Sequence, residues 1–141
     1  MLWCKNNGDD LNNFHKFCDN IGPSLLVIKT ESNYIFGGYT KENWQKVEFN
    51  YKEDSSAFLF SLTNKKKIKV INGKRALVND IHYGPIFGHG GGYEICLHNP
   101  LLSKPIQVTN RKDYGIKIST LTGNLSTKPI EIEVYKIKTK T

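Results

Sequence analysis

The sequence lacks several features that would assign it to a class at once. It has no run of about 18 apolar residues, so it offers no candidate membrane-spanning helix. Its N-terminal segment has neither the basic start nor the apolar stretch of a signal peptide, and we expect a cytoplasmic location. Linkers, low-complexity tracts and internal repeats are also absent, which indicates one domain over residues 1–141.

Cysteine is scarce. Cys4, Cys18 and Cys96 are odd in number and too widely spaced for a disulfide framework, so a reducing compartment fits them better. Histidine lies near cysteine at two places, His15 with Cys18 and His98 with Cys96, and each pair supplies at most two ligands. A structural zinc site needs four ligands, so we expect no metal site and no cofactor.

Acidic residues and arginine are both in short supply. The formal net charge is +7, and arginine occurs only at Arg75 and Arg111, so lysine supplies almost all of the positive charge. Such a surface attracts acidic proteins, anionic lipids and nucleic acids alike. Specific nucleic-acid binding relies on arginine and exposed aromatic side chains, which argues against nucleic acid as the partner. The densest lysine cluster, residues 65–67, is expected at an exposed hairpin tip, where weak contact with anionic lipid stays open.

One helix is predicted near the N-terminus. Apolar residues recur there at helical spacing: Leu11, Phe14, Phe17 and Cys18. Asp9 or Asp10 is suited to cap the first turn, and Gly22 followed by Pro23 is expected to end the helix.

The rest of the chain reads as short strands. Runs of β-forming residues occur at 24–30, 34–40, 57–62, 68–71, 75–80, 93–98, 106–109, 115–120 and 130–137. Turn signals separate them about every 8–12 residues, and no strand–helix–strand alternation is present. This pattern predicts a mainly β fold, either a sandwich or a barrel.

Two local features lie between the first strands. Gly37 and Gly38 interrupt a strand, which indicates a bulge or a close approach of another part of the chain. Residues 41–56 are mixed and polar, and we predict a loop there with one helical turn near Trp44.

Two further features concern strand pairing. Asn72 followed by Gly73 is the strongest short hairpin signal in the chain, so residues 75–80 are expected to return beside 68–71. In the last strand, the alternation predicts that Ile130, Ile132 and Val134 point inward.

The segment of residues 83–99, YGPIFGHGGGYEICLHN, is the densest in glycine. A dinucleotide-binding turn needs G-x-G-x-x-G; Gly88 and Gly90 fit the first two positions, but Tyr93 occupies the third. A P-loop needs Lys followed by Ser or Thr, which is missing. The residues after the glycines alternate with a period of two, so no helix follows to hold a phosphate.

A catalytic role for this segment would use His89 as a base and Glu94 as its partner. The G-x-S-x-G motif of a nucleophile elbow is absent, and a histidine between glycines is poorly held for base catalysis. A structural role is favoured, because glycine permits positive φ and close backbone approach while Pro85 fixes the entry. We therefore predict a tight corner of the β-fold.

Five blocks resemble, in order and spacing, the TLDc domain of oxidation-resistance proteins: FHKFCDNIGPSLLVIKT, IFGGYT, AFLFSL, YGPIFGHGGGYEICL and IEIEVYKI. The resemblance runs from about Leu2 to Ile137. It implies a two-sheet antiparallel β-sandwich with a few short helices, a protist source, and a domain excised from a longer protein. Residues 99–124 match the family poorly, and Glu94 stands where the family usually has aspartate.

The resemblance also implies roles in resistance to oxidative stress and in binding the vacuolar proton-pumping ATPase, and a peripheral location on endomembranes is compatible with that partner. It brings no agreed catalytic site. The motif positions that carry over are Cys18, Asp19, Gly22, Pro23, Gly37 and Gly38, which we take as structural, and Gly84, Pro85, Gly88, Gly90, Gly91 and Gly92 in the glycine segment.

Two classes of function follow. The first is a non-catalytic module that docks on a protein, with a subunit of the vacuolar proton-pumping ATPase as the expected partner. Its binding residues would be Gly84, Pro85, Gly88, His89, Gly90, Gly91, Gly92 and Glu94. The alternative is a redox-active or other enzyme that uses Cys4 or the His89 and Glu94 pair, or a basic module that binds lipid or nucleic acid.

Overall fold

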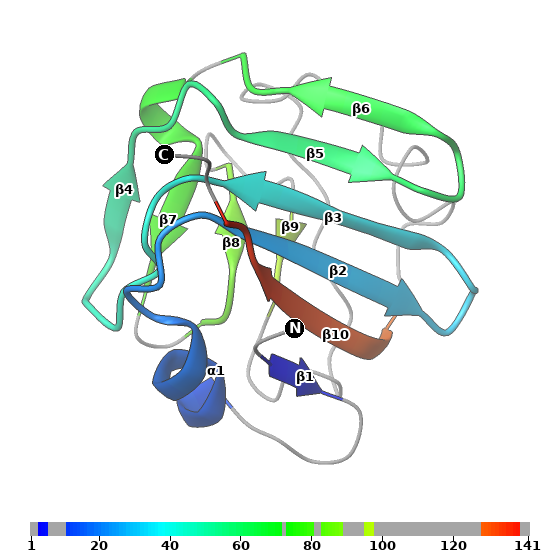
Figure 1. Cartoon of the computed structure of the whole chain (residues 1–141), viewed down its shortest axis with the longest axis horizontal. Coiled ribbons are helices and arrows are strands. Elements are labelled where there is room, and N and C mark those ends of the chain that lie inside the picture. Colours follow the sequence, from blue (N-terminus) through cyan, green and yellow to red (C-terminus); the bar gives the residue numbers. More distant parts are fainter. Residues whose placement is uncertain are drawn as a thin grey trace.

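Two antiparallel sheets pack face to face, and Figure 1 shows the larger sheet in front of the smaller one. The computed structural model describes residues 3–5, 11–71, 73–80, 83–88, 95–97 and 128–138. The predicted strands 106–109 and 115–120, and the proposed caps Asp9 and Asp10, lie outside these residues. The predicted mainly β, two-sheet class is confirmed, and the two separate sheets make it a sandwich and not a closed barrel.

Ten strands occur among the described residues. The large sheet has the order β1 (Trp3–Lys5), β10 (Pro129–Lys136), β2 (Ser24–Thr30), β3 (Ile35–Thr40), β5 (Phe58–Ser61) and β6 (Lys66–Lys69). The small sheet has the order β4 (Asn50–Lys52), β7 (Leu77–Asn79), β8 (Ile86–Phe87) and β9 (Ile95–Cys96). A single α-helix, α1 (Leu11–Cys18), and a short 3-10 helix, η1 (Gly73–Arg75), complete the described elements, and no described helix is long and apolar enough to cross a membrane.

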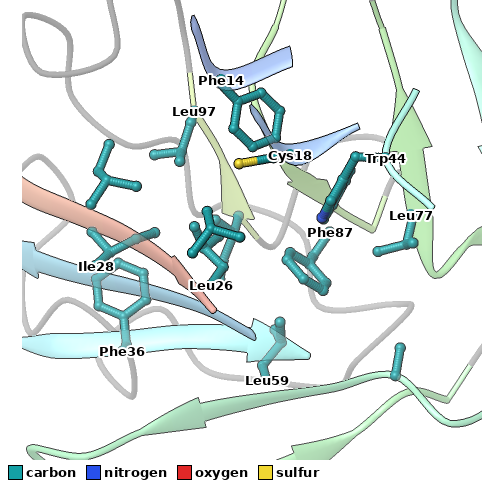
Figure 2. Close-up of a cluster of buried hydrophobic side chains, with 14 of the residues drawn as sticks. Phe14, Cys18, Leu26, Ile28, Phe36, Trp44, Leu59, Leu77, Phe87 and Leu97 are labelled. Atoms are coloured by element: carbon teal, nitrogen blue, oxygen red, sulfur yellow. The ribbon is translucent and has the colours of Figure 1, made fainter. Parts of the chain in front are cut away.

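The core lies between the two sheets, and Figure 2 shows part of it. Alternate residues of β2 are buried, so Leu26 and Ile28 point toward the small sheet while their neighbours point away. Phe36 and Leu59 continue this layer on β3 and β5, and Phe87 faces it from the small sheet. Burying these side chains drives the two layers together.

Helix α1 ends at Cys18, four residues before the predicted stop at Gly22. Asn20 and Gly22 both have positive φ, 59° and 78°, and they turn the chain toward β2. The backbone N–H of Asn20 donates to the Trp44 carbonyl at 2.9 Å, and that of Gly22 donates to the Asn43 Oδ1 at 2.7 Å. Positive φ suits glycine, which explains the motif glycine just before Pro23.

The two glycines in β3 mark a close approach, as one of the two predicted alternatives stated. A Cβ atom on Gly37 would lie 1.8 Å from the carbonyl oxygen of Leu26. A Cβ atom on Gly38 would lie 2.6 Å from the ring of Phe87 on the opposite sheet. No room for a side chain exists at either position, and at Gly38 the missing side chain lets the two sheets meet.

The prediction for residues 41–56 was wrong in part. The segment contains a strand, β4, which pairs with β7 at the edge of the small sheet, and Trp44 forms a parallel bridge with Asp19 instead of a helical turn. Asn50 and Tyr51 are exposed, so β4 has no buried alternation from which a strand could be recognised.

The predicted hairpin at Asn72 and Gly73 was also wrong. Gly73 begins η1, and the next strand, β7, leaves the large sheet and pairs with β4 and β8 in the small one. The chain crosses between sheets at this point, so β6 stays an edge strand. In the hairpin before it, Lys65 has a positive φ of 55° in the turn, as expected for a lysine tip, while residues 66 and 67 already belong to β6.

The last strand is confirmed with one correction. Ile132 and Val134 are buried as predicted, but Ile130 is 44% exposed. The pairing of β10 with β2 shifts between Pro129 and Glu131, which reverses the facing of the residue between them. A shift of one residue moves a side chain to the other face of a sheet.

Asp54 is a buried carboxylate that ties together the ends of the segment between β3 and β5. It accepts hydrogen bonds from the Thr40 hydroxyl at 2.6 Å, the Lys41 N–H at 3.0 Å, and both the N–H and hydroxyl of Ser56 at 2.8 and 2.5 Å. Its own N–H donates to the Gly73 carbonyl at 2.8 Å. Burial by itself raises the pKa of Asp54, but the four hydrogen bonds outweigh burial, and the pKa lies below its usual value.

Replacing Gly38 with alanine is expected to lower the free energy of unfolding by about 1–3 kcal/mol, because the new methyl overlaps a Phe87 ring that is itself fully buried. Gly73→Ala is the control: its nearest contact would be Ser55 Cα at 3.3 Å, so its effect should stay below about 1 kcal/mol. Urea unfolding of the three proteins measures both values, and equal losses would contradict the proposed crowding at Gly38.

Asp54→Asn should lower stability at neutral pH by about 2 kcal/mol, since hydrogen bonds to a buried charge are lost. A carboxyl with a lowered folded-state pKa stabilises the fold above its unfolded-state pKa and loses this contribution as the pH falls through the folded-state value. Wild-type stability should therefore fall below about pH 4, and that of Asp54→Asn should fall less. Urea unfolding at neutral and acid pH measures this, with exposed Glu53→Gln as the control that behaves like wild type.

Candidate functional site at the glycine hairpin

Residues 84–97 form a hairpin in the small sheet, which we call the glycine hairpin. Its strands are β8 and β9, in which Ile86 pairs with Cys96 and Phe87 with Ile95. The pairing continues to the open end, where the Gly84 N–H donates to the Leu97 carbonyl at 3.0 Å. The Leu97 N–H in turn donates to the Pro85 carbonyl at 3.2 Å. The described parts of the segment predicted as a corner thus pair as two antiparallel strands, and residues 89–94 between them lie outside the described residues.

Gly88 directs the chain out of β8. Its φ is +80°, and its N–H donates to the Ala76 carbonyl at 2.9 Å, which ties the exit of β8 to the start of β7. Positive φ at this position is well suited to glycine. At the entry of the hairpin, the Tyr83 N–H donates to the Asp80 carbonyl at 3.1 Å.

The predicted binding residues fall into two groups. The first group is buried and flanks β8: Gly84 and Pro85 precede the strand, and Gly88 follows it. His89, Gly90, Gly91, Gly92 and Glu94 lie outside the described residues, and they belong to the connection between β8 and β9.

Helix α1 contacts the entry of the glycine hairpin through a buried histidine. The His15 Nδ1 lies 2.9 and 3.0 Å from the two carboxylate oxygens of Asp19, one helical turn further on. The His15 Nε2 lies 3.2 Å from the Tyr83 carbonyl oxygen, which can only accept a hydrogen bond. His15 therefore joins two of the sequence blocks that lie far apart in the chain.

Trp44 fills the space between the helix, the glycine hairpin and the large sheet. Its ring meets Phe87 edge-on at a centroid distance of 5.6 Å and Phe14 at 6.3 Å. Its indole N–H donates to the Ser24 hydroxyl at 3.1 Å, so the one polar atom of the ring is satisfied. Figure 2 shows Trp44 between Phe14 of α1 and Phe87 of β8.

Both described thiols are buried and poorly ionised. Burial, and to a smaller extent Asp19, raises the pKa of Cys18 to about 12. Burial, followed by Asp80, raises the pKa of Cys96 to about 12. In Figure 2 the Cys18 sulfur points into the cluster beside Phe14. Cys18 belongs to the core between the sheets. Cys96 faces the other side of the small sheet, where it packs with Val78 and Ile86, while its neighbours Ile95 and Leu97 belong to the core.

The described His15–Asp19 pair links elements of the fold and is not placed to act on a substrate. His15 and Asp19 form a histidine–carboxylate pair, but the outer ring nitrogen is directed at a backbone carbonyl and the side chain is 6% exposed. A base must reach a substrate proton, and this nitrogen has no path to one. Within the described ranges, no three His, Cys, Asp or Glu side chains come close enough together to hold a metal ion.

Sequence reasoning missed His15 and Trp44 as the links to the glycine hairpin. For His15 a signal was present, since histidine and aspartate four residues apart on a helix can pair. The sequence analysis noted only that His15 lies near Cys18. In the structure, the partner of His15 on the helix is Asp19. For Trp44 the signal was weak, because a lone tryptophan in a polar segment does not show which elements it packs against.

Comparison with known proteins finds relatives that share part of this sequence. The chain is similar to proteins named mTOR-associated protein MEAK7: 33% identical over 63 residues in Xenopus laevis, 34% over 58 residues in Danio rerio and 31% over 74 residues in Mus musculus. These alignments cover 43%, 41% and 50% of the chain but only 14%, 13% and 16% of the relatives. The chain thus matches a small part of each much longer protein.

The family model of the TLDc domain matches residues 4–138. That span includes α1, both sheets and the glycine hairpin, and it agrees with the extent of the resemblance in the sequence blocks. This chain belongs to the TLDc domain family.

Proposed function

We propose that this chain is a non-catalytic protein-interaction module whose contact element is the connection of the glycine hairpin, residues 89–94. Its partner is a subunit of the vacuolar proton-pumping ATPase. Such a partner would hold the chain at the cytoplasmic face of endomembranes. A role in resistance to oxidative stress would then follow from the partner and not from chemistry in this domain.

The observation that carries this proposal is how firmly both ends of residues 89–94 are held. Phe87 and Ile95 are paired directly opposite each other, and the Gly88 N–H is bonded to the neighbouring strand. His15 adds a contact at the hairpin entry. Binding residues are commonly carried on loops that a rigid scaffold positions. A short connection with anchored ends is such an element, and His89 is its side chain best suited to recognition.

The relatives give a second indication of an interaction role. Their name describes association with mTOR, and this description applies to those proteins. The chain corresponds to a small fraction of their length, so the activity of the whole proteins does not transfer to it. The shared segment supports a domain that contributes contacts within a larger assembly.

The redox alternative has less support. At neutral pH a thiol with a pKa of about 12 is ionised in only about one molecule in 10⁵, and a thiolate is needed for attack on peroxide. This disfavours Cys18 and Cys96. Cys4 lies on β1, the edge strand of the large sheet, opposite Glu133 in the pairing. The second enzymatic pair, His89 and Glu94, lies outside the described residues.

The partner proposal is tested with His89→Ala. Binding of the purified peripheral sector of the vacuolar proton-pumping ATPase should weaken by about tenfold or more if the imidazole is a recognised side chain. The melting temperature should stay nearly unchanged. Surface plasmon resonance measures the affinity, and Lys46→Ala, an exposed position beside β4, is the matched control that should bind like wild type.

Gly91→Val separates recognition from architecture. If residues 89–94 only complete the fold, this variant loses binding in step with stability and His89→Ala binds normally. That pair of results would overturn the proposed contact element. Failure of the wild-type chain to bind the pump at all would overturn the partner.

The alternative is tested by removing every thiol. A folded variant with Cys4→Ser, Cys18→Ser and Cys96→Ser should consume hydrogen peroxide no faster and no slower than wild type. The reason is that the two described thiols are buried and almost wholly protonated. A colorimetric peroxide assay makes the comparison, with Cys4→Ser alone as the control for the thiol on the edge strand. A clear fall in the rate of the triple variant would favour the redox function.

A further inference from the structure

The large sheet has a second face, turned away from the small sheet, which we call the outer face. The strand pairings define two rows of side chains across it. The first row, from β10 to β6, is Tyr135, Leu25, Tyr39, Phe58 and Lys69. The second row is Glu133, Val27, Gly37, Phe60 and Lys67. These residues alternate with the buried core residues of the same strands, so they share the face opposite the core.

Each row is apolar in the middle and polar or charged at its ends. Leu25, Val27, Phe58 and Phe60 supply the apolar centre, and all four keep partial exposure. On β5, the Phe58 ring stacks on Tyr39 at 5.1 Å. No described helix or strand lies in front of this sheet in Figure 1. The outer face is therefore a broad, partly apolar surface.

The charges on the outer face have opposite signs on β10, which lies next to the edge strand β1, and on the edge strand β6. Glu133 lies on β10 and accepts a hydrogen bond from the Tyr135 hydroxyl. Glu131, two residues earlier on the same strand, shares a hydrogen bond with Glu133, which raises the pKa of Glu131, while Lys29 lowers it. On β6, Lys67 is exposed, with its Nζ 4.4 Å from the Phe58 ring centroid. Acidic side chains on β10 and a basic side chain on β6 thus flank the apolar centre.

This arrangement is complementary to itself under one symmetry. A two-fold axis parallel to the strands and above β3 brings β10 of one copy over β6 of the other. Glu133 then faces Lys67 of the second copy, and Val27 faces its Phe60. A two-fold axis across the strands would instead stack β10 on β10 and β6 on β6, with like charges opposed. Electrostatics therefore selects the first arrangement.

We propose that two copies of this chain associate outer face to outer face, around a two-fold axis parallel to β3. Aligned sheets pack about 10 Å apart, a gap that glutamate and lysine side chains can bridge. Gly37 lies at the centre of the second row and is buried, because the Phe60 ring covers it: a Cβ atom there would lie 2.9 Å from Phe60 Cζ. This inference concerns the large sheet and does not rest on the proposed function of the glycine hairpin.

The size of the face sets the strength of the dimer. From β10 to β6 there are four strand spacings, a width of about 19 Å, and two rows of side chains extend only a few residues along the strands. Such a contact falls below the size of a permanent interface and belongs with weak, transient ones. The dissociation constant is therefore expected in the micromolar range or above.

The test is a charge exchange followed by sedimentation equilibrium. The wild-type chain should show reversible dimerisation between about 10 and 500 µM, a range suited to weak contacts. Lys67→Glu or Glu133→Lys alone should weaken self-association by about tenfold or more, because each places like charges together at both ends of the dimer. An equimolar mixture of the two variants should dimerise again, since every acidic site then meets a basic one.

Controls keep the result specific. Lys46→Glu makes the same change in net charge away from the outer face and should dimerise like wild type. Raising the salt concentration should weaken the wild-type dimer and needs no variant, so a folding defect in one variant would not spoil the test. A chain that stays monomeric over the whole range, or single variants whose mixture does not recover, would overturn the proposal.

Discussion

The contact between Gly38 and Phe87 is the constraint on which the rest of the fold depends. The absence of a side chain on β3 lets the Phe87 ring of β8 lie directly against the large sheet. Trp44 then packs on Phe87, and Phe14 of α1 packs on Trp44, so one aromatic series connects both sheets to the helix. Dense packing of this kind leaves little freedom for any member to shift alone. The glycine hairpin is positioned because Phe87, its central residue, is fixed in this series.

The sequence revealed the strands that carry a clear run of β-forming residues, and it missed the exposed strand β4 and the two-residue strand β8. Strand β2 was predicted with its observed bounds, because residues 24–30 are almost continuously β-forming. Strand β4 was missed because an edge strand with exposed side chains carries no alternation. The error at Asn72 and Gly73 has another cause: a turn signal is local, while the choice of sheet depends on distant partners. Asp54 is one such distant partner, because its N–H donates a hydrogen bond to the Gly73 carbonyl.

The sequence indicated where the candidate site lies in the chain but not which other elements pack against it. Glycine content alone singled out residues 83–99, which were predicted as a tight corner and not as a hairpin, since glycine permits positive φ and close approach. Its support by α1 was not visible, because the bond from His15 to the Tyr83 carbonyl joins residues 68 positions apart. A backbone carbonyl leaves no mark in the sequence, so no pattern could have named it as the partner. Two of the family blocks, those that contain His15 and Tyr83, therefore contact each other in the fold.

The two surfaces discussed above lie on different layers of the sandwich. The glycine hairpin belongs to the small sheet and the outer face to the large one, with the core between them. A dimer through the outer face would consequently leave both hairpins uncovered and directed away from each other. Two copies of a weak contact element on one rigid body bind a partner with repeated sites more tightly than either copy alone, provided that the spacing allows both to engage. For a partner with such repeated sites, weak self-association and weak docking would together give stable attachment.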